Sequence, residues 1–275
     1  MLSEQPLQGP TRPTNRGPVK TVIVSFRAIF ALILREMSTT YAKSPGGYIW
    51  AIAEPLAGTA LLAFAFSLAF RSPPLGTNFA LFYASGLLPF MIYTDIANKV
   101  AESIRYSKQL LFYPKITFLD AILARFILNL TVHIIVTAII FTGLYWVFDL
   151  QNTLHFPSIF QAIALAAALG LGIGTMNCFL ISQYPTWLRV WAIFNRPLFI
   201  VSCVFFIPEN INPVMREYLF WNPLVHVVGE MRTAFYSRYT GDYISYVYVI
   251  AIAGSCFLFG LALLVRYHRD ILNKP

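Results

Sequence analysis

Residue types that can carry out chemistry are sparse in this sequence, and they form no recognisable catalytic motif. The four histidines are scattered along the chain, at His133, His155, His226 and His268. The sequence contains neither HExxH, a zinc hydrolase motif, nor GxSxG, a serine hydrolase motif. The three cysteines lie in apolar runs without a CxxC pair, which is typical of small buried residues. We therefore expect no catalytic residue, no metal and no cofactor in this chain.

The segment GLGIGT at 170–175 has the glycine content of a phosphate-binding loop. It lacks the lysine of the GxxxxGK[ST] motif, and it lies inside an apolar run instead of after a strand. Ala166, Gly170 and Gly174 recur every four residues, a spacing typical of close helix packing in membranes. The sequence therefore predicts a helix contact here and no nucleotide site.

The composition of the chain is strongly apolar. Of the 275 residues 57% are hydrophobic and 12% are charged, about half of the ~25% that is typical of soluble domains. The hydrophobic residues come in long runs, so the sequence predicts an all-α integral membrane protein. In such a protein the formal net charge of +8 reflects orientation in the membrane rather than a nucleic-acid partner.

The N-terminal region divides into two parts. Residues 1–20 contain four prolines, two glycines and no apolar run, which predicts a disordered cytoplasmic tail. Residues 21–42 carry apolar side chains at helical spacing with charged residues opposite. This pattern predicts an amphipathic helix lying in the membrane interface, and a first membrane span is the alternative.

Six apolar runs are each close to the ~20 residues that a helix needs to cross a bilayer. We predict spans at about 48–70, 79–98, 118–147, 158–182, 187–207 and 244–266. The third is long enough to tilt or to extend beyond the bilayer, and Arg189 and Arg196 interrupt the fifth. Residues 21–266 then form a single transmembrane domain, followed by a short cytoplasmic tail at 267–275.

Lysines and arginines concentrate on one side of these predicted spans. One side carries Arg12, Arg16, Lys20, Arg27, Arg35, Lys43, Lys99, Arg105, Lys108, Lys115, Arg266, Arg269 and Lys274. The other side carries Arg71, Arg216, Arg232 and Arg238. Because cytoplasmic loops are enriched in Lys and Arg, we expect both termini in the cytoplasm.

The cytoplasmic segment AESIRYSKQLLFYPKI at 101–116 is neither a linker nor a span. Basic and apolar residues alternate over 101–113, and Pro114 ends the helical pattern. The segment predicts a short amphipathic helix with an exposed apolar end, which indicates an interaction surface. A helix lying on the lipid head groups is the alternative.

Charged residues inside predicted spans are costly and usually face protein or water. Glu54 precedes Pro55, and Arg196 precedes Pro197, so we expect both polar side chains to turn inward. Arg189 and Arg196 are candidates for lining a path for an anionic substrate, with a structural ion pair or a head-group contact as the alternative. Asp95 and Asp120, near the cytoplasmic face, are expected to pair with Lys99 and Arg125.

Aromatic residues make up 16% of the chain, and many fit the belts found at membrane interfaces. Sugar rings also stack on aromatic faces. Tyr41, Tyr48 and Trp50 lie where the interfacial helix meets the first span, and with Glu54 they are candidates for a carbohydrate path.

The external segment 208–240 is polar, but its residues follow the pattern of short helices. Asn222 is expected to cap a helix that has Pro223 at its first position. His226 and Glu230 are then one turn apart and are expected to pair, while Arg232 falls on a different side. We interpret the segment as two short re-entrant helices and these four polar residues as a candidate external gate.

Three segments in this order resemble a known family. They are LREMSTTYAKSPGGYIWAIAEPL at 34–56, LLFYPKI at 110–116, and VSCVFFIPENINPVMREYLFWNPLVHVVGEMRTAFY at 201–236. The chain resembles the permeases of type-2 ABC exporters, and among them the membrane-spanning subunit of capsular polysaccharide exporters. The resemblance covers nearly all of the chain after residue 20.

The resemblance implies a non-enzymatic subunit that works as a homodimer with two separate ATPase subunits in the bacterial inner membrane. The helix at 101–113 would be the coupling helix that docks into the ATPase, through Arg105, Lys108, Leu110, Leu111 and Phe112. ATP would bind only to that partner. The substrate would be a lipid-linked anionic polysaccharide, passed to a periplasmic adaptor and an outer-membrane conduit, and membrane lipids would surround the chain.

Other functions remain open on sequence alone. An exporter of O-antigen, teichoic acid or another lipid-linked glycan is the nearest alternative. A small-molecule or lipid ABC exporter of the same fold is a second. A secondary transporter or channel is disfavoured, because the two halves of the chain show no inverted repeat.

Overall fold

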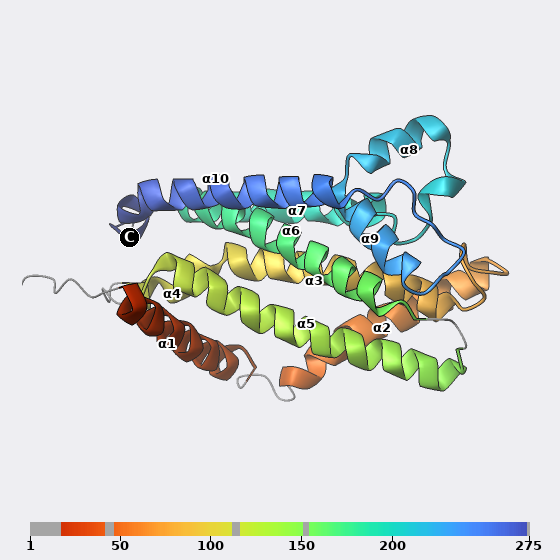
Figure 1. Ribbon diagram of the computed structural model, residues 1–275, viewed down its shortest axis with the longest axis horizontal. Helices are drawn as coiled ribbons and strands as arrows, with labels where there is room; N and C mark the ends of the chain where they lie inside the picture. Colours follow the sequence, from red (N-terminus) through yellow and green to blue (C-terminus); the bar gives the residue numbers. More distant parts are fainter. Residues whose placement is uncertain (1–17, 42–46, 112–115, 151–153, 274–275) are drawn as a thin grey trace, which may run out of the picture.

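The computed structural model describes residues 18–41, 47–111, 116–150 and 154–273, and every regular element in these ranges is a helix (Figure 1). Within them, five helices are long and apolar enough to cross a membrane. The five are α2 (Gly47–Ala69), α3 (Phe79–Ala101), α5 (Phe118–Phe148), α6 (Phe156–Gln183) and α10 (Tyr246–Asn273). The predicted all-α membrane class is confirmed.

Local side-chain contacts set several helix ends. α3 begins after Asn78, whose side chain accepts a hydrogen bond from the Leu81 amide at 3.1 Å. α5 begins after Thr117, where Thr117 and Asp120 bond to each other's amides in a capping box. It ends at Asp149, which has a left-handed φ of 44°. The ends of four helices, α2, α3, α5 and α6, lie within a few residues of the ends of the predicted spans. α10 continues past the predicted end at 266.

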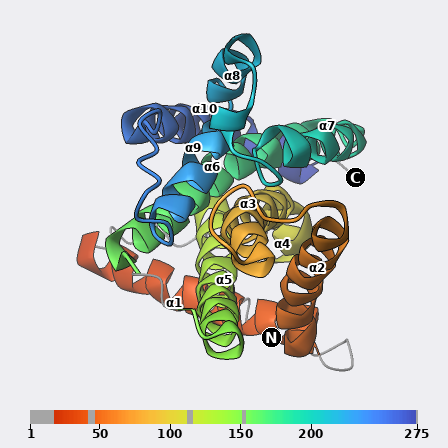
Figure 2. The same ribbon diagram turned by 90° about the vertical axis from the view of Figure 1, so that its right-hand side faces the viewer.

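The fifth predicted span, 187–207, is helical only in its first part. α7 (Trp187–Val201) has 15 residues, which is about 22 Å of helix against a bilayer core of ~30 Å. Residues 202–207 form an irregular turn with Cys203 at a φ of 59°. α7 extends along the bundle in Figure 1 and lies apart from α10 in Figure 2. A sixth crossing built from α7 and the turn after it stays a prediction.

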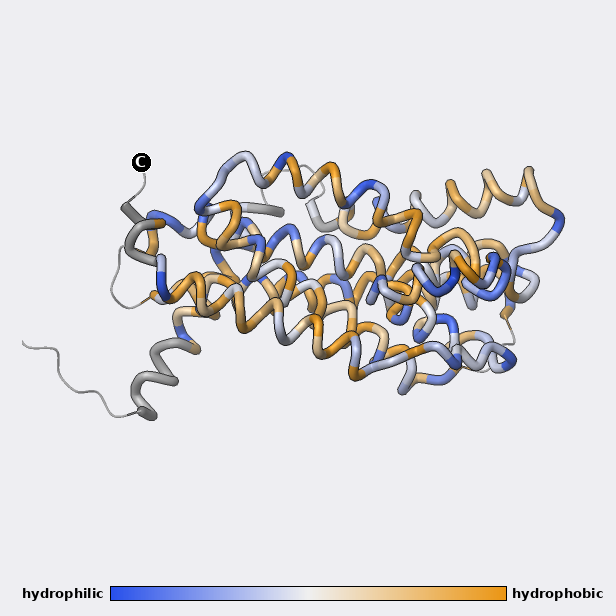
Figure 3. The backbone as a smooth tube through the Cα atoms, turned by 90° about the horizontal axis from the view of Figure 1, so that it is seen from above, coloured by the Kyte–Doolittle hydropathy of each residue, from blue (hydrophilic) through white to orange (hydrophobic). Residues whose placement is uncertain are grey.

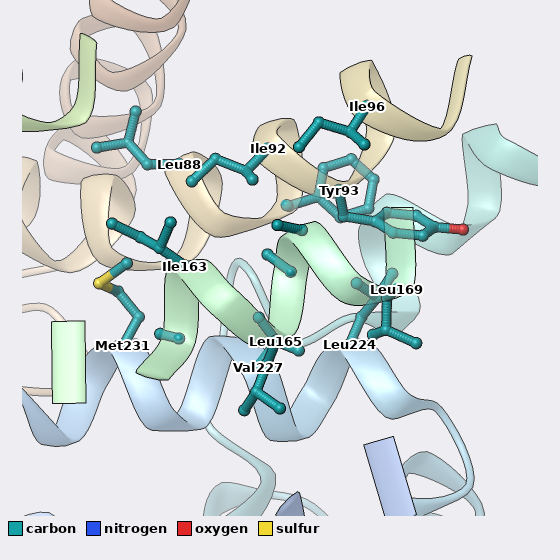
Figure 4. Packing of buried hydrophobic residues seen from close by; sticks show 14 of the residues in the cluster. Leu88, Ile92, Tyr93, Ile96, Ile163, Leu165, Leu169, Leu224, Val227 and Met231 are labelled. Carbon is teal, nitrogen blue, oxygen red and sulfur yellow. The ribbon is translucent and has the colours of Figure 1, made fainter. Parts of the chain in front are cut away.

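α6 is the central helix, and it packs against α3, α10 and α9 (Pro223–Thr233). A Cβ added at Gly170 or Gly174 would lie within 3.0 Å of α3, and one added at Gly172 would overlap the carbonyl oxygen of Ala253 on α10. The predicted packing role of the small-residue stripe is therefore confirmed. Figure 4 shows the apolar core beside it, to which α3, α6 and α9 contribute Leu88, Ile92, Tyr93, Ile96, Ile163, Leu165, Leu169, Leu224, Val227 and Met231.

The bundle has two distinct ends. One carries α1 (Pro18–Glu36), α4 (Ser103–Leu111) and the C-terminal end of α10, and we call it the α4 end (Figure 1). The other, the α9 end, carries α8 (Pro213–Phe220), the short turn η2 (Pro208–Asn210) and α9. Figure 3 shows hydrophobic residues along the bundle and a dense group of hydrophilic residues at the α9 end.

α1 is not among the candidate spans, and it runs across the other helices at an angle (Figures 1 and 2). A π-helical turn, η1 (Met37–Tyr41), extends it toward α2. α1 contacts α5, and Leu32 is its buried anchor. The arrangement agrees with the predicted interfacial helix, although the helix begins at Pro18, within residues predicted to belong to the tail.

Candidate functional site

A buried arginine joins four helices at the α4 end. Arg125 on α5 is only 4% exposed, and its Nη2 donates to Oε1 of Glu36 on α1 at 2.7 Å. Its Nη1 donates to the Lys99 carbonyl on α3 at 3.0 Å. Its guanidinium carbon lies 4.3 Å from the ring centroid of Tyr106 on α4. α1, α3, α4 and α5 therefore meet on one side chain, whose charge is compensated by an ion pair.

The carboxylate pairings expected from the sequence, Asp95 and Asp120 with Lys99 and Arg125, are wrong. Asp120 accepts from a backbone amide at the start of its own helix. Asp95 Oδ2 instead lies 3.0 Å from Nε2 of His133 on α5. Both expectations were based on charges that are near in sequence, whereas the actual partners come from other helices or from the same helix turn.

The predicted ATPase-docking residues on α4 differ in exposure. Arg105 is exposed, and Lys108, Leu110 and Leu111 are half-buried. Phe112 lies outside the described residues. The inner face of α4 packs on α5 and α6. α4 thus offers a polar outward face on a helix that is anchored to the bundle.

A polar cavity of about 360 Å³ lies between α2, α3 and α5. Its lining includes Trp50, Glu54, Asp95, Lys99, Asn129 and His133. Asn129 and His133 follow Arg125 at four-residue intervals, so one face of α5 carries a polar stripe. This stripe is visible in the sequence and was missed there, because the surrounding residues of the span are apolar.

The candidate carbohydrate-path residues are only partly brought together. Trp50 and Glu54 line the same cavity, and both are exposed. The side chains of Tyr41 and Tyr48 lie outside the described residues. The expectation that Glu54 turns into the protein interior is wrong for the single chain.

The two arginines of α7 lie elsewhere. Arg189 and Arg196 are both exposed, so the expectation that Arg196 turns inward is also wrong for the single chain. α7 itself has no buried residue. It is held to α3 in part by Trp191, whose Nε1 donates to Oδ1 of Asn98 at 3.1 Å.

At the α9 end, Arg232 is fully buried and faces carbonyl oxygens instead of a carboxylate. Its Nη1 donates to the Phe206 carbonyl at 2.9 Å, and its Nη2 donates to the Val204 carbonyl at 3.0 Å. Its guanidinium carbon lies 4.4 Å from the ring centroid of Phe82 on α3. Burial lowers the pKa of Arg232 from its usual range. Arg232 thereby fixes the turn after α7 against α9 and α3.

The expected pair of His226 and Glu230 is wrong. Nδ1 of His226 accepts from the Ser245 amide at 3.2 Å, so Nε2 carries the proton and donates to the Phe220 carbonyl at 2.9 Å. Glu230 is 2% exposed, and its Oε2 accepts from the Tyr246 hydroxyl at 2.8 Å. Each side chain thus bonds to a segment outside α9 and ties this helix to its neighbours.

Asn222 caps α9 as predicted, with Pro223 at the first helical position. Its Oδ1 accepts from the Leu224 amide at 3.0 Å, and its Nδ2 donates to the Ser202 hydroxyl at 3.1 Å. The other three candidate gate residues, His226, Glu230 and Arg232, are buried within the chain. The neighbouring helix α8 has no buried residue. Insertion of these helices into the outer leaflet stays a prediction.

Comparison with known proteins identifies related chains. Residues 27–236 match the family described as ABC-2 type transporter. The polysialic acid transport protein KpsM of Escherichia coli is 30% identical over 233 residues, which are 85% of this chain and 90% of that protein. The capsule polysaccharide export inner-membrane protein CtrC of Neisseria meningitidis serogroup B is 23% identical over 92% of this chain and 95% of that protein. BexB of Haemophilus influenzae, which has the same description, is 22% identical over 92% of this chain and 95% of that protein.

Proposed function

The chain belongs to the ABC-2 type transporter family, and from this premise we propose that it is the membrane-spanning subunit of an ATP-driven exporter of lipid-linked capsular polysaccharide. The similarity to relatives named for polysialic acid transport and capsule polysaccharide export carries the proposal, because it extends over 85–92% of the chain. The protein resides in the bacterial inner membrane with both termini in the cytoplasm.

Energy for export comes from a separate ATPase subunit. The sequence has no GxxxxGK[ST] phosphate loop, so ATP hydrolysis needs a partner. The proposed docking element is α4, together with the residues that follow it to 113. Arg105 on α4 is exposed, and the neighbouring Tyr106, also largely exposed, lies against the guanidinium of the buried Arg125. A push on α4 would therefore reach α1, α3 and α5 directly.

Two copies of the chain enclose the proposed transport path. α2 and α7 carry large apolar side chains that nothing in the described chain covers, among them Leu61, Phe64, Leu68, Ile193, Phe194 and Ile200. The same helices carry the exposed Glu54, Arg189 and Arg196. In a homodimer the apolar side chains would be buried where the two copies meet. The charged side chains would face a water-filled path between the copies. The glycan then passes to a periplasmic adaptor and an outer-membrane conduit.

Deletion of the gene tests the exported substrate. Capsular polysaccharide should accumulate inside the cell and disappear from its surface, and the native gene should restore it. The measurement is the sugar composition of surface and intracellular extracts. Unchanged surface capsule combined with loss of O-antigen or teichoic acid would replace the proposed substrate, and no change in any glycan would contradict export of a glycan.

Substitution on the docking element tests the ATPase partner. The variant Leu110→Asp, Leu111→Asp and Phe112→Asp should lose co-purification of the ATPase and export of the glycan. Arg105→Glu should weaken co-purification with little effect on the fold, since the side chain of Arg105 is exposed. Arg238→Glu, exposed at the α9 end, is the matched control. Normal co-purification with the triple variant would reject the docking assignment.

A further inference from the structure

The cavity between α2, α3 and α5 brings Glu54, a candidate path residue, together with Lys99, which the transport proposal does not use. Glu54 and Lys99 both line it, and neither has a hydrogen-bond or ion-pair partner for its charged group among the described residues. Both lie in or at the end of helices that are apolar enough to span a membrane. Unpaired charges in such segments are costly unless water or a ligand compensates them. The cavity therefore needs an occupant that satisfies one negative and one positive group.

The side chains of Asp95, His133 and Asn129, which also line the cavity, already have partners. Asp95 Oδ2 lies 3.0 Å from Nε2 of His133, so these two side chains are each other's partners. Asn129 Nδ2 donates to the Arg125 carbonyl at 2.7 Å. Asp95 is still 43% exposed at its side chain, so one of its oxygens can accept a further hydrogen bond. The anionic acceptors available to a ligand are thus the carboxylates of Glu54 and Asp95, and the cationic donor is the ammonium of Lys99.

We propose that this cavity binds the head group of a zwitterionic phospholipid with a primary ammonium, such as phosphatidylethanolamine. Its ammonium donates three hydrogen bonds and matches the two carboxylates, and its phosphate accepts from Lys99. A purely anionic head group would bring a third negative charge beside the carboxylates of Glu54 and Asp95, with Lys99 as the one lysine or arginine among the described lining residues. A cavity of about 360 Å³ is within the range of small-molecule sites.

The position of the cavity fits a lipid ligand. Trp50 and Glu54, which line the cavity from α2, are exposed, so the cavity is open to the surroundings of the single chain. Trp50, which lines the cavity and is largely exposed, offers apolar ring surface for the start of an acyl chain. The site depends on the membrane location of the chain and not on the proposed export function.

Lipid retention by the purified full chain tests the proposal. The chain is exchanged into detergent that contains equal amounts of phosphatidylethanolamine, phosphatidylcholine and phosphatidylglycerol, and retained lipid is measured by native mass spectrometry. Phosphatidylethanolamine should be retained in preference to both others. Phosphatidylcholine has the same charges but a methylated ammonium that donates no hydrogen bond, so it separates hydrogen bonding from charge alone.

Variants locate the site. Glu54→Gln and Lys99→Gln should each weaken retention of phosphatidylethanolamine roughly tenfold, since each removes a hydrogen bond to a charged group. Glu54→Asp keeps the charge and should retain most of the preference. Glu217→Gln and Arg189→Gln remove exposed charges outside the cavity and should change nothing. Equal retention of the three lipids, a preference for phosphatidylglycerol, or retention that is insensitive to Glu54→Gln and Lys99→Gln would each overturn the proposal.

Discussion

Two buried guanidinium groups at opposite ends of the bundle have different surroundings. Arg125 has a carboxylate partner in Glu36, a carbonyl and an aromatic ring. Arg232 has two carbonyl oxygens and an aromatic ring. Removing one member of a buried ion pair leaves an uncompensated charge, whereas removing Arg232 leaves carbonyl groups without donors. The two sites therefore predict different results on substitution.

The Arg125 pair should show strong energetic coupling. Arg125→Gln should lower the free energy of unfolding by about 3–5 kcal/mol, because it removes the ion pair with Glu36 and the hydrogen bond to the Lys99 carbonyl. Glu36→Gln should cost less, since Arg125 keeps the Lys99 carbonyl and the Tyr106 ring. Thermal unfolding in detergent measures both, and the double variant should cost less than the sum of the single variants. Additive costs would show that the ion pair contributes nothing.

Arg232 should be required for the stability of the α9 end. Arg232→Met removes both donors to the turn after α7 and should cost at least about 2 kcal/mol. Arg232→Lys should not restore stability, because an ammonium lacks the planar pair of donors. Arg238→Met, at an exposed position nearby in sequence, should stay within about 0.5 kcal/mol of the native chain. Equal melting temperatures for Arg232→Met and Arg238→Met would contradict this role.

The sequence predicts residue contacts only where they are local. Asn222 and Pro223 at the start of α9 follow a capping rule that spans three residues, and the structure confirms it. The partners of Arg125, Asp95 and His226 come from other segments of the chain, so no spacing rule reaches them. His226 and Glu230 have the correct spacing, but His226 bonds to the Phe220 carbonyl of α8 and the Ser245 amide, and Glu230 bonds to the Tyr246 hydroxyl of α10.

At the scale of elements, apolar length was the most reliable signal. It predicted α2, α3, α5 and α6 to within a few residues, because a bilayer imposes the same minimum length on each. Apolar length was least informative for 187–207. Two arginines interrupt the apolar residues of α7, and the helix is followed by a turn in which Cys203 has a positive φ. The stripe of small residues on α6 was also predictable, since close approach of helices requires residues without bulk.

The glycines of α6 yield a prediction with an internal control. Gly172→Ala should destabilise the chain by about 1–3 kcal/mol, because the added methyl group would overlap the Ala253 carbonyl on α10 and force the helices apart. Gly143→Ala on α5 meets nothing within 4 Å and should be neutral or stabilising by up to about 1 kcal/mol. Thermal unfolding of the two variants is the measurement. A loss of stability in both would point to a general requirement for glycine and not to the α6–α10 contact.

At the scale of the whole molecule, the number of membrane crossings depends on α7. α7 lies between α6, which ends at Gln183, and the helices of the α9 end. The length of α7 alone falls short of the bilayer core, yet α4 and α9 lie at opposite ends of the bundle in Figure 1. Between α4 and α9 along the chain lie α5, α6, α7, η2 and α8, and only α5, α6 and α7 are candidates for crossing between the two ends. An odd number of crossings places α4 and α9 on opposite sides of the membrane, and an even number places them on the same side.

Cysteine labelling distinguishes these two cases. Gln109 on α4 and Ser237 after α9 are both exposed, so Gln109→Cys and Ser237→Cys give accessible thiols at the two ends. A membrane-impermeant maleimide should label Ser237→Cys in intact spheroplasts, and it should label Gln109→Cys only after the membrane is permeabilised. The native chain is the control, because Cys178 and Cys203 are buried and Cys256 is half-buried on α10. Labelling of both variants under the same condition would mean that α7 does not cross, and the predicted fifth span with its cytoplasmic C-terminus would then be wrong.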